Sequence, residues 1–267
     1  VVPMAAGGVL SVYNHVSGQH LKIELVGAFD TGSGMKFGAI TPVRVLDTRS
    51  SAKMAGGVVK SVQVAGLSGI PANARTVLAN VTLLSASATS AATLWAQGTA
   101  QPSIRYVQAV VGQTAACSGI FQLGSTGKLN VVHTAGTAHV LVDVYGYFDA
   151  AGTAWYVPAV PQRLLDTRST SPRPVRGAVR AVPFNVPTGA VASLVNITAV
   201  KPAGPGYLSA TASSSDPIAT SVVNFRTGET RPNAGVVPLA NKTTHIRVGT
   251  DAVDVLVDWY GTFVNAS

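Results

Sequence analysis

Short apolar segments recur along this chain, and turn-forming residues separate them. Residues 140–145 and 255–260 are runs of β-branched and aromatic side chains that end at a glycine, and residues 77–83 and 194–200 have the same character. Proline- and glycine-rich stretches such as 201–206 lie between such runs. Strand-length segments spaced by turns are typical of antiparallel sheets. The pattern predicts an all-β chain of tandem antiparallel β-sandwich or barrel-like domains, without helices longer than one or two turns.

The sequence is duplicated. Residues 42–50 recur 119 positions later as 161–169, and the closing segment 139–148 recurs 115 positions later as 254–263. Between them, Asn80-Val81-Thr82 matches Asn196-Ile197-Thr198, and each triplet follows a proline by nine positions. Blocks in the same order at a near-constant offset indicate a tandem repeat. We expect a first full repeat over 37–149 and a second over 156–264.

A third, partial copy opens the chain. Residues 1–4 match 236–239, and residues 20–29 match the closing segments of both full repeats. We therefore expect residues 1–30 to be the trailing strands of an incomplete repeat. Either the chain is cut from a longer array, or these strands complete a neighbouring repeat within or between molecules, because open strand edges invite pairing.

Three ordered motifs resemble a known family. A leading Arg-Val/Leu-Leu-Asp-Thr-Arg, a central Asn-Val/Ile-Thr-Ala-Val and a closing Val-Asp-Val-Tyr-Gly-Tyr-Phe are similar to a repeat module of secreted actinobacterial proteins, found alone, in tandem or appended to exported hydrolases and surface proteins. The resemblance implies an extracellular or cell-surface location, and it implies no reaction. Two departures stand out: residues 92–95 replace the later Gly206-Tyr207-Leu208, and Glu24 stands where Asp143 and Asp258 stand in the full repeats.

Composition narrows the class of protein. The 267 residues (27.2 kDa) are 47% hydrophobic and only 11% charged, which argues against disorder. No apolar run reaches the length of a membrane span. The net charge of +8 favours anionic partners. The basic residues are dispersed, however, and their densest run, 163–180, contains no aromatic residue, which argues against a nucleic-acid surface. An anionic cell-wall glycopolymer or polysaccharide remains as a partner, beside other copies of the chain or adjoining domains.

Acidic side chains are scarce, and only the pairs Asp47 with Asp143 and Asp166 with Asp258 occur in both full repeats. In Leu-Asp-Thr-Arg the carboxylate is placed to accept backbone N–H groups and to pair with arginine. A carboxylate within an apolar strand needs a buried donor. We therefore expect structural roles, with Asp143 and Asp258 accepting hydrogen bonds from Arg49 and Arg168 or from backbone amides. We assign no catalytic residue, and ligand contact by these carboxylates is the alternative.

The remaining candidates are amides, aromatics and histidines. Asn80 and Asn196 are glycosylation sequons by letter, but their matching strand positions favour buried hydrogen bonds. Possible ligand-binding aromatics are Trp95, Tyr145, Trp259 and Tyr260, since flat rings stack on sugars; a place in the core or in an interdomain seam is the alternative.

No cofactor or metal is expected. His139 and Asp143 are four positions apart on one strand, about 13 Å at the usual rise, which is too far for one ion. Cys117 is the lone cysteine and reads as a small buried residue.

These features predict a non-catalytic extracellular β-repeat protein that serves cell-surface structure, adhesion or assembly, with strand sharing as one route. Two alternatives stay open. The first is a carbohydrate- or cell-wall-binding accessory module of an exported enzyme. The second is a phage tail or fibre component built from the same kind of module.

Overall fold

The computed structural model describes residues 4, 7–13, 18, 20, 23, 25, 27–30, 34–169 and 172–266. These residues contain strands, turns and bends and no helix, so the all-β prediction is confirmed. The strands form antiparallel sheets in sandwich-like arrangement, without closing into a barrel. No helix in this part of the chain has the length and apolarity to cross a membrane.

Nine strands come from the first half of the described chain and eight from the second. Their bounds are β1 (Lys36–Asp47), β2 (Met54–Ala55), β3 (Lys60–Gln63), β4 (Thr76–Leu84), β5 (Ser90–Ala96), β6 (Val107–Ala109), β7 (Ala115–Gln122), β8 (Lys128–His133), β9 (Thr137–Asp149), β10 (Ala154–Asp166), β11 (Val179–Pro183), β12 (Ala190–Val200), β13 (Gly206–Thr211), β14 (Val223–Phe225), β15 (Arg231–Pro238), β16 (Thr243–Val248) and β17 (Asp254–Asn265).

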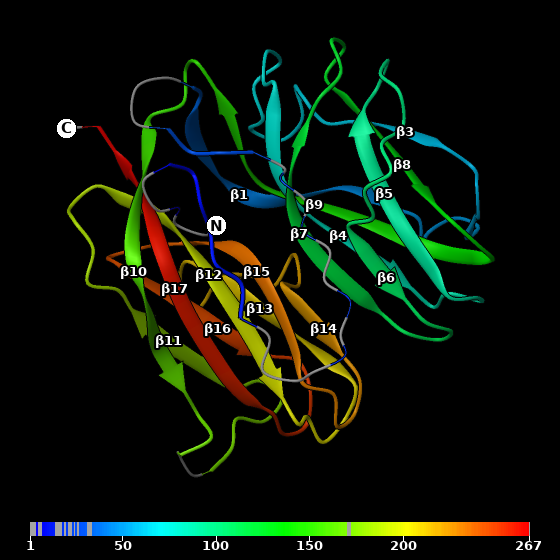
Figure 1. Cartoon of the computed structure of the whole chain (residues 1–267). Helices are drawn as coiled ribbons and strands as arrows, with labels where there is room; N and C mark the ends of the chain where they lie inside the picture. Colours follow the sequence, from blue (N-terminus) through cyan, green and yellow to red (C-terminus); the bar gives the residue numbers. More distant parts are fainter. Residues whose placement is uncertain are drawn as a thin grey trace.

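The two halves repeat each other strand for strand. β1 corresponds to β10, β3 to β11, and each of β4–β9 to one of β12–β17 in the same order. The short strand β2 corresponds to an isolated bridge between Val175 and Ala252. Even the register shifts recur, since β1 and β10 each carry two, at matching places against β9 and β17. The duplication seen in the sequence therefore extends to the backbone. The halves form two lobes in Figure 1.

One long sheet runs through both halves. Its strand order is β15-β12-β17-β10-β1-β9-β4-β7. Counted inward from the two ends, each strand of one half has its equivalent in the other half, as expected for a two-fold axis between β10 and β1. The halves join where β1 pairs with β10, at Phe37 opposite Ala154. A four-stranded sheet, β3-β8-β5-β6 or β11-β16-β13-β14, completes the sandwich of each half.

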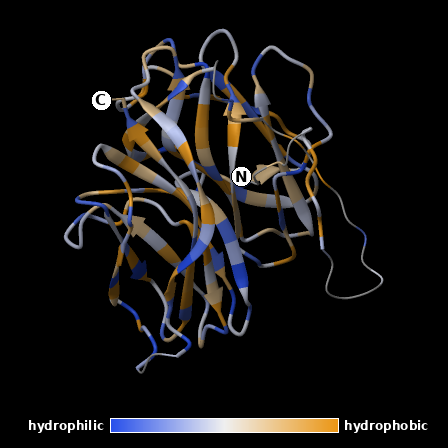
Figure 2. Ribbon diagram, turned by 60° about the vertical axis from the view of Figure 1, so that its left-hand side comes forward, coloured by the Kyte–Doolittle hydropathy of each residue, from blue (hydrophilic) through white to orange (hydrophobic). Residues whose placement is uncertain are grey.

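Alternation along the strands separates three cores. On β9, Val140, Val142 and Val144 point into the core of the first half, whereas Tyr145 and Phe148 belong to a separate cluster between the halves. The second half has its own core, around β12, β16 and β17. Hydrophobic segments accordingly lie mainly along the strands (Figure 2). We call the third cluster the seam; its buried members are Phe37, Leu78, Tyr145, Phe148, Ala154, Ala192, Leu194, Val236 and Phe263.

Aromatic rings dominate the seam. Phe37 stacks on Phe263 with ring centroids 4.2 Å apart, and Phe148 lies 5.3 Å from Phe37. The closing Tyr-Gly motif makes room for such packing, because the Phe37 ring lies directly over Gly146 and a Cβ there would collide with it. Gly261 has the same relation to the Tyr156 ring. In each repeat, the recurring glycine therefore leaves the space in which an aromatic ring of the leading strand packs.

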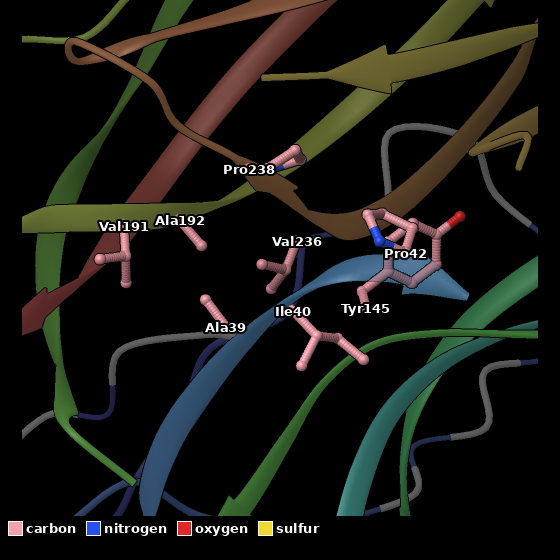
Figure 3. A pocket seen from close by; sticks show the side chains of 8 residues that line it. All are labelled: Ala39, Ile40, Pro42, Tyr145, Val191, Ala192, Val236 and Pro238. Atoms are coloured by element: carbon pink, nitrogen blue, oxygen red, sulfur yellow. The ribbon is translucent and has the colours of Figure 1, made fainter. Parts of the chain in front are cut away.

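The seam is almost completely filled. A cavity of about 10 Å³ remains between Ala39 and Tyr145 of the first half and Ala192 and Val236 of the second. Figure 3 shows these side chains around it, together with Ile40, Pro42, Val191 and Pro238. That volume is at the lower limit for one water molecule, so the cavity has no room for a larger ligand.

The predicted N-terminal strands fall partly outside the described residues, Glu24 included. The described residues between 4 and 30 are not in strands, and the trailing-strand interpretation stays a prediction. Phe29 is placed, however. Its ring lies 4.6 Å from Tyr156, 6.1 Å from Phe148 and 6.0 Å from Phe263, between centroids. Phe29 is the residue that the sequence match aligns with Phe148 and Phe263, and one cluster contains all three rings.

We expect Gly146→Ala to destabilise the protein by about 1–3 kcal/mol, because the added methyl group must displace the Phe37 ring. Gly27→Ala is the matched control, since a Cβ there meets nothing within 4 Å. Urea denaturation of both variants measures the effect. Equal midpoints for the two variants would contradict this account of the seam.

Candidate functional site

The three sequence motifs meet in one row of side chains across the long sheet. In the first half, Arg44 on β1 is directly opposite Asp143 on β9, and Asp143 is opposite Asn80 on β4. Residues opposite each other in adjacent strands share a face of the sheet. In the second half Arg163, Asp258 and Asn196 hold the same positions. The leading, closing and central motifs therefore supply arginine, aspartate and asparagine to a single constellation.

The arginine and the aspartate form a two-pronged ion pair. Arg44 donates from Nε to Asp143 Oδ1 at 2.7 Å and from Nη2 to Oδ2 at 3.0 Å. Arg163 donates to Asp258 in the same way, at 2.8 and 3.2 Å. Parallel hydrogen bonds of this kind fix geometry as well as energy. The pair consequently locks the leading strand of each repeat to its closing strand.

The partner predicted for Asp143 and Asp258 was wrong. Arg44 and Arg163 hold these carboxylates, and Arg49 and Arg168 do not. The reason is register: Arg44 lies within β1 opposite Asp143, whereas Arg49 follows the end of the strand. The signal that could have found Arg44 was its own recurrence as Arg163 in the leading motif.

The last arginine of the leading motif instead closes a turn. Arg49 donates its backbone N–H to Asp47 Oδ1 at 2.9 Å and its Nη2 to Oδ2 at 2.6 Å. Arg168 and Asp166 make the same contacts at 3.1 and 2.6 Å. A carboxylate that accepts from the backbone two residues on is a turn former.

The threonine of the motif ties this turn to the closing strand. The buried Thr48 Oγ1 accepts from the N–H of Val140 at 2.9 Å, and the Thr48 N–H donates to the Val140 carbonyl at 3.2 Å. Thr167 and Val255 do the same in the second half. Each residue of Asp-Thr-Arg therefore has a defined contact within its own repeat.

The carboxylates respond to these neighbours in opposite ways. Hydrogen bonds from Arg49 lower the pKa of Asp47 to about 2, and those from Arg168 lower the pKa of Asp166 to about 2. Burial raises the pKa of Asp143 against the opposing pull of Arg44. Near neutral pH Asp47 and Asp166 are ionised, so these two carboxylates act as hydrogen-bond acceptors and not as proton donors.

The two copies of the row differ in their surroundings. Asp143 is completely buried, whereas 21% of the Asp258 side chain is exposed. The first row faces the other repeat: Asn80 Nδ2 and the Tyr145 hydroxyl both donate to the Ser221 carbonyl, at 3.0 and 3.1 Å. Within the described part of the chain, Asn196 donates to Thr198 Oγ1 of its own strand at 3.2 Å. Asn80 thus belongs to the joint between the repeats.

The joint continues between the outermost strands of the long sheet, β7 and β15. Asn233 donates from Nδ2 to Asn80 Oδ1 at 3.1 Å and accepts from the Ser118 N–H at 3.2 Å. Ser118 Oγ also donates to Asn80 Oδ1 at 3.2 Å. Side-chain amides therefore satisfy backbone and polar groups where the sheet itself stays open.

Three of the four candidate ligand-binding aromatics are buried. Trp95 and Trp259 are each 8% exposed and Tyr145 is 5% exposed. Both indole N–H groups donate to carbonyls, of Thr99 and Gly261 respectively. A buried ring has no free face for a sugar, so the ligand-platform interpretation is wrong for these three, and the core or seam alternative holds. Tyr260 is half-buried beside the seam.

An exposed tryptophan lies elsewhere. Trp155 on β10 is 41% exposed, and Lys36 Nζ lies 4.9 Å from its ring centroid. Sequence reasoning did not select it, because it falls in the segment between the repeats and has no aromatic counterpart in the first copy.

The other candidate groups are in structural contacts. Within the described residues no three His, Cys, Asp or Glu side chains come together as a metal site. His139 Nδ1 lies 3.3 Å from Thr48 Oγ1. Cys117 is a free, half-buried thiol whose pKa burial raises. An open cavity of about 580 Å³ lies where the two halves meet, and Val110, Gln113, Arg226, Glu229 and Arg231 line it together with Thr227 and Gly228.

No protein-family model matches the sequence, and no curated protein matches it. Among solved structures, the tandem CBM22-1-CBM22-2 domain of Paenibacillus barcinonensis Xyn10C is 10% identical, over 89% of this chain and 100% of that chain, with a TM-score of 0.24. A Lactobacillus farciminis oxalate decarboxylase in complex with formate is 8% identical, over 88% and 89%, with a TM-score of 0.20. A mutant Bacillus subtilis oxalate decarboxylase, OxdC, is 9% identical, over 92% and 86%, with a TM-score of 0.21. Similarities this low carry no argument about function.

We expect Asp143→Ala to cost about 3 kcal/mol of unfolding free energy, because the half-buried Arg44 loses both short hydrogen bonds to Asp143 and keeps the longer 3.5 Å contact with Asp47. Asp258→Ala removes the same contacts from a more exposed pair and should cost about 1 kcal/mol or less. Denaturant titration of both variants provides the comparison. A loss as large for Asp258→Ala as for Asp143→Ala would refute the role given to burial.

Acid should weaken the turn of the leading motif. The pKa of Asp47 is lower in the folded protein than the ordinary value of 3.8, so its stabilisation is present above about pH 4 and is lost as the pH falls toward about 2. Asp47→Asn and Asp166→Asn should each lower the melting temperature by a few degrees near pH 7 and by much less near pH 2. Asp251→Asn, at a 75% exposed carboxylate, is the control. Melting curves with the same deficit at every pH would show that the Asp47 charge is not responsible.

Proposed function

We propose that this chain is a non-catalytic, extracellular structural module that builds cell-surface assemblies by joining repeats through the aromatic seam. The observation that carries the proposal is the continuous sheet across two duplicated halves, paired at Phe37 and Ala154 and filled by phenylalanine rings. Two sandwiches that share a sheet and a buried core move as one body. Such a unit transmits force and position along an array.

The use of the charged residues supports this function. The recurring carboxylates Asp47, Asp143, Asp166 and Asp258 all accept hydrogen bonds from arginines of their own repeat. The charged residues that occur in both repeats thus form their contacts within each repeat. These contacts give the two repeats the same backbone shape. That property suits a building block used in series.

The position of Phe29 supports joining through the seam. This residue corresponds in sequence to Phe148 and Phe263, and the three ring centroids lie 6.0–6.1 Å from one another. Apolar and edge-to-face contacts of this kind add to the area buried. The seam therefore accepts the Phe29 ring of the same chain, and under this proposal a second molecule supplies the equivalent ring in the same way.

A carbohydrate-binding accessory role is the second candidate. The observation that favours it is the exposed Trp155 ring, with Lys36 Nζ over one of its faces, because an open indole face stacks on pyranose rings and an ammonium group attracts acidic sugars. Binding to peptidoglycan, chitin and cellulose, compared between the wild type and Trp155→Ala, tests it. Absence of binding to all three polymers would remove this candidate.

Particle mass and electron microscopy test the assembly proposal. We expect the full chain to form concentration-dependent multiples of its 27.2 kDa mass, and Phe29→Ala to shift the distribution toward the monomer by at least several-fold. Leu25→Ala, at an 82% exposed residue of the same segment, is the matched control and should leave the distribution unchanged. A wild-type chain that stays monomeric at every concentration would overturn assembly through the seam.

Disulfide trapping then shows whose segment fills the seam. Phe29→Cys combined with Tyr156→Cys, in a Cys117→Ser background, places two thiols where the rings now lie 4.6 Å apart between centroids. Covalent dimers on oxidation support exchange between molecules. Covalent monomers alone contradict exchange and leave the segment bound to its own chain.

A further inference from the structure

The open cavity between the halves is built from two equivalent turns. Residues 110–113 connect β6 to β7, and residues 226–229 connect β14 to β15, 116 positions later. Both turns are held in the same manner: Gln113 Oε1 accepts from the Val110 N–H at 3.1 Å, and Glu229 Oε2 accepts from the Arg226 N–H at 3.0 Å. The turns face each other, since Gln113 Nε2 donates to Glu229 Oε1 at 3.3 Å.

The side chains of the two turns have diverged in charge. Where the first repeat has Val110, Gln113 and Ala115, the second has Arg226, Glu229 and Arg231. The backbone frame does not require these charges, because the uncharged first turn has the same hydrogen bonds. These charges are therefore available for contacts outside the frame that the two turns share.

The arrangement leaves a positive charge in the cavity. Glu229 already accepts from Gln113, from the Arg226 backbone and from Arg231 Nη1, at 3.3 Å in the last case. Among the described residues Arg226 forms no ion pair, and its side chain lines the cavity. Its charge is therefore not neutralised by a carboxylate of the protein, and an oxyanion in the cavity would provide the missing opposite charge.

We propose that this cavity binds the carboxylate or phosphate groups of an acidic glycopolymer, with Arg226 and Arg231 as the anion-binding residues. The cavity is wide open to solvent, so one unit of a polymer can lie against these residues while the rest of the polymer continues outside. Val110 and the exposed backbone at Gly228 offer apolar and close-contact walls for such a unit. The net charge of +8 attracts a polyanion over long range. This proposal does not depend on assembly through the seam.

Titration calorimetry with the full chain tests binding, using four probes: polygalacturonate for carboxylates, poly(glycerol phosphate) for phosphates, neutral dextran, and single-stranded DNA. We expect saturable binding of one or both acidic glycopolymers and none of dextran. Which of the two binds more tightly identifies the source of the oxyanion. Equal binding of dextran, or tighter binding of DNA than of either glycopolymer, would overturn the proposal.

Variants that restore the residues of the first repeat locate the site. Arg226→Val and Arg231→Ala should each weaken glycopolymer binding about tenfold, the usual effect of losing a hydrogen bond to a charged group. Arg226→Gln serves if the valine variant does not fold. Arg176→Gln, at a 66% exposed side chain, matches the loss of charge away from the cavity and should change affinity less than twofold. The same loss in Arg176→Gln as in Arg226→Val would mean a diffuse basic surface and would refute the site.

Glu229→Gln is expected to change glycopolymer affinity in the opposite direction to the arginine variants. The first repeat carries Gln113 at this position and retains the turn, so the variant keeps the hydrogen bond to the Arg226 N–H and frees Arg231 from its carboxylate. We expect glycopolymer affinity to rise several-fold. Unchanged or weaker binding in a folded Glu229→Gln protein would contradict an anion site between these arginines.

Discussion

The buried pair of Arg44 and Asp143 is the interaction on which the first repeat depends. Asp143 has no exposed surface, so its charge is tolerated only because Arg44 donates to both of its oxygens. The pair joins the first and last strands of the repeat, which are far apart in the sequence and adjacent in the sheet. A register error of one residue would point Asp143 into the apolar core. The ion pair therefore acts more as a specification of register than as a source of net stability.

The second repeat contains the same ion pair in a more exposed environment. Arg163 and Asp258 have the same geometry, but solvent reaches both side chains. The difference arises from the seam, since the first row lies against Ser221 and Asn233 of the other half through Asn80. Duplicated segments thus keep their hydrogen-bond pattern while their environments diverge. The charged turn at Arg226 and Glu229 is a second case of this divergence, in which the side chains changed and the backbone contacts stayed.

The sequence alone predicted those features that depend on local pattern or on internal comparison. The strand class follows from runs such as 140–145, and the duplication follows from recurring blocks. What failed depends on pairing between distant strands. The partner of Asp143 is decided by the register of β1 on β9, which the spacing of Arg44 and Arg49 does not reveal. Burial of Tyr145 likewise follows from the face of β9 that meets the other repeat, and that contact has no signature in either strand by itself.

The triangle of Phe29, Phe148 and Phe263 has a consequence for how such proteins grow in evolution. Phe148 and Phe263 are one residue position in two copies, the sequence match predicts the same origin for Phe29, and the three rings lie at nearly the same separation from one another. A newly duplicated repeat therefore already encodes part of its own interface, because it carries the phenylalanine that packs against the same residue of the existing repeat. Lengthening the polypeptide requires no invention of a fresh interface, and unequal recombination by itself can supply longer or shorter versions to selection.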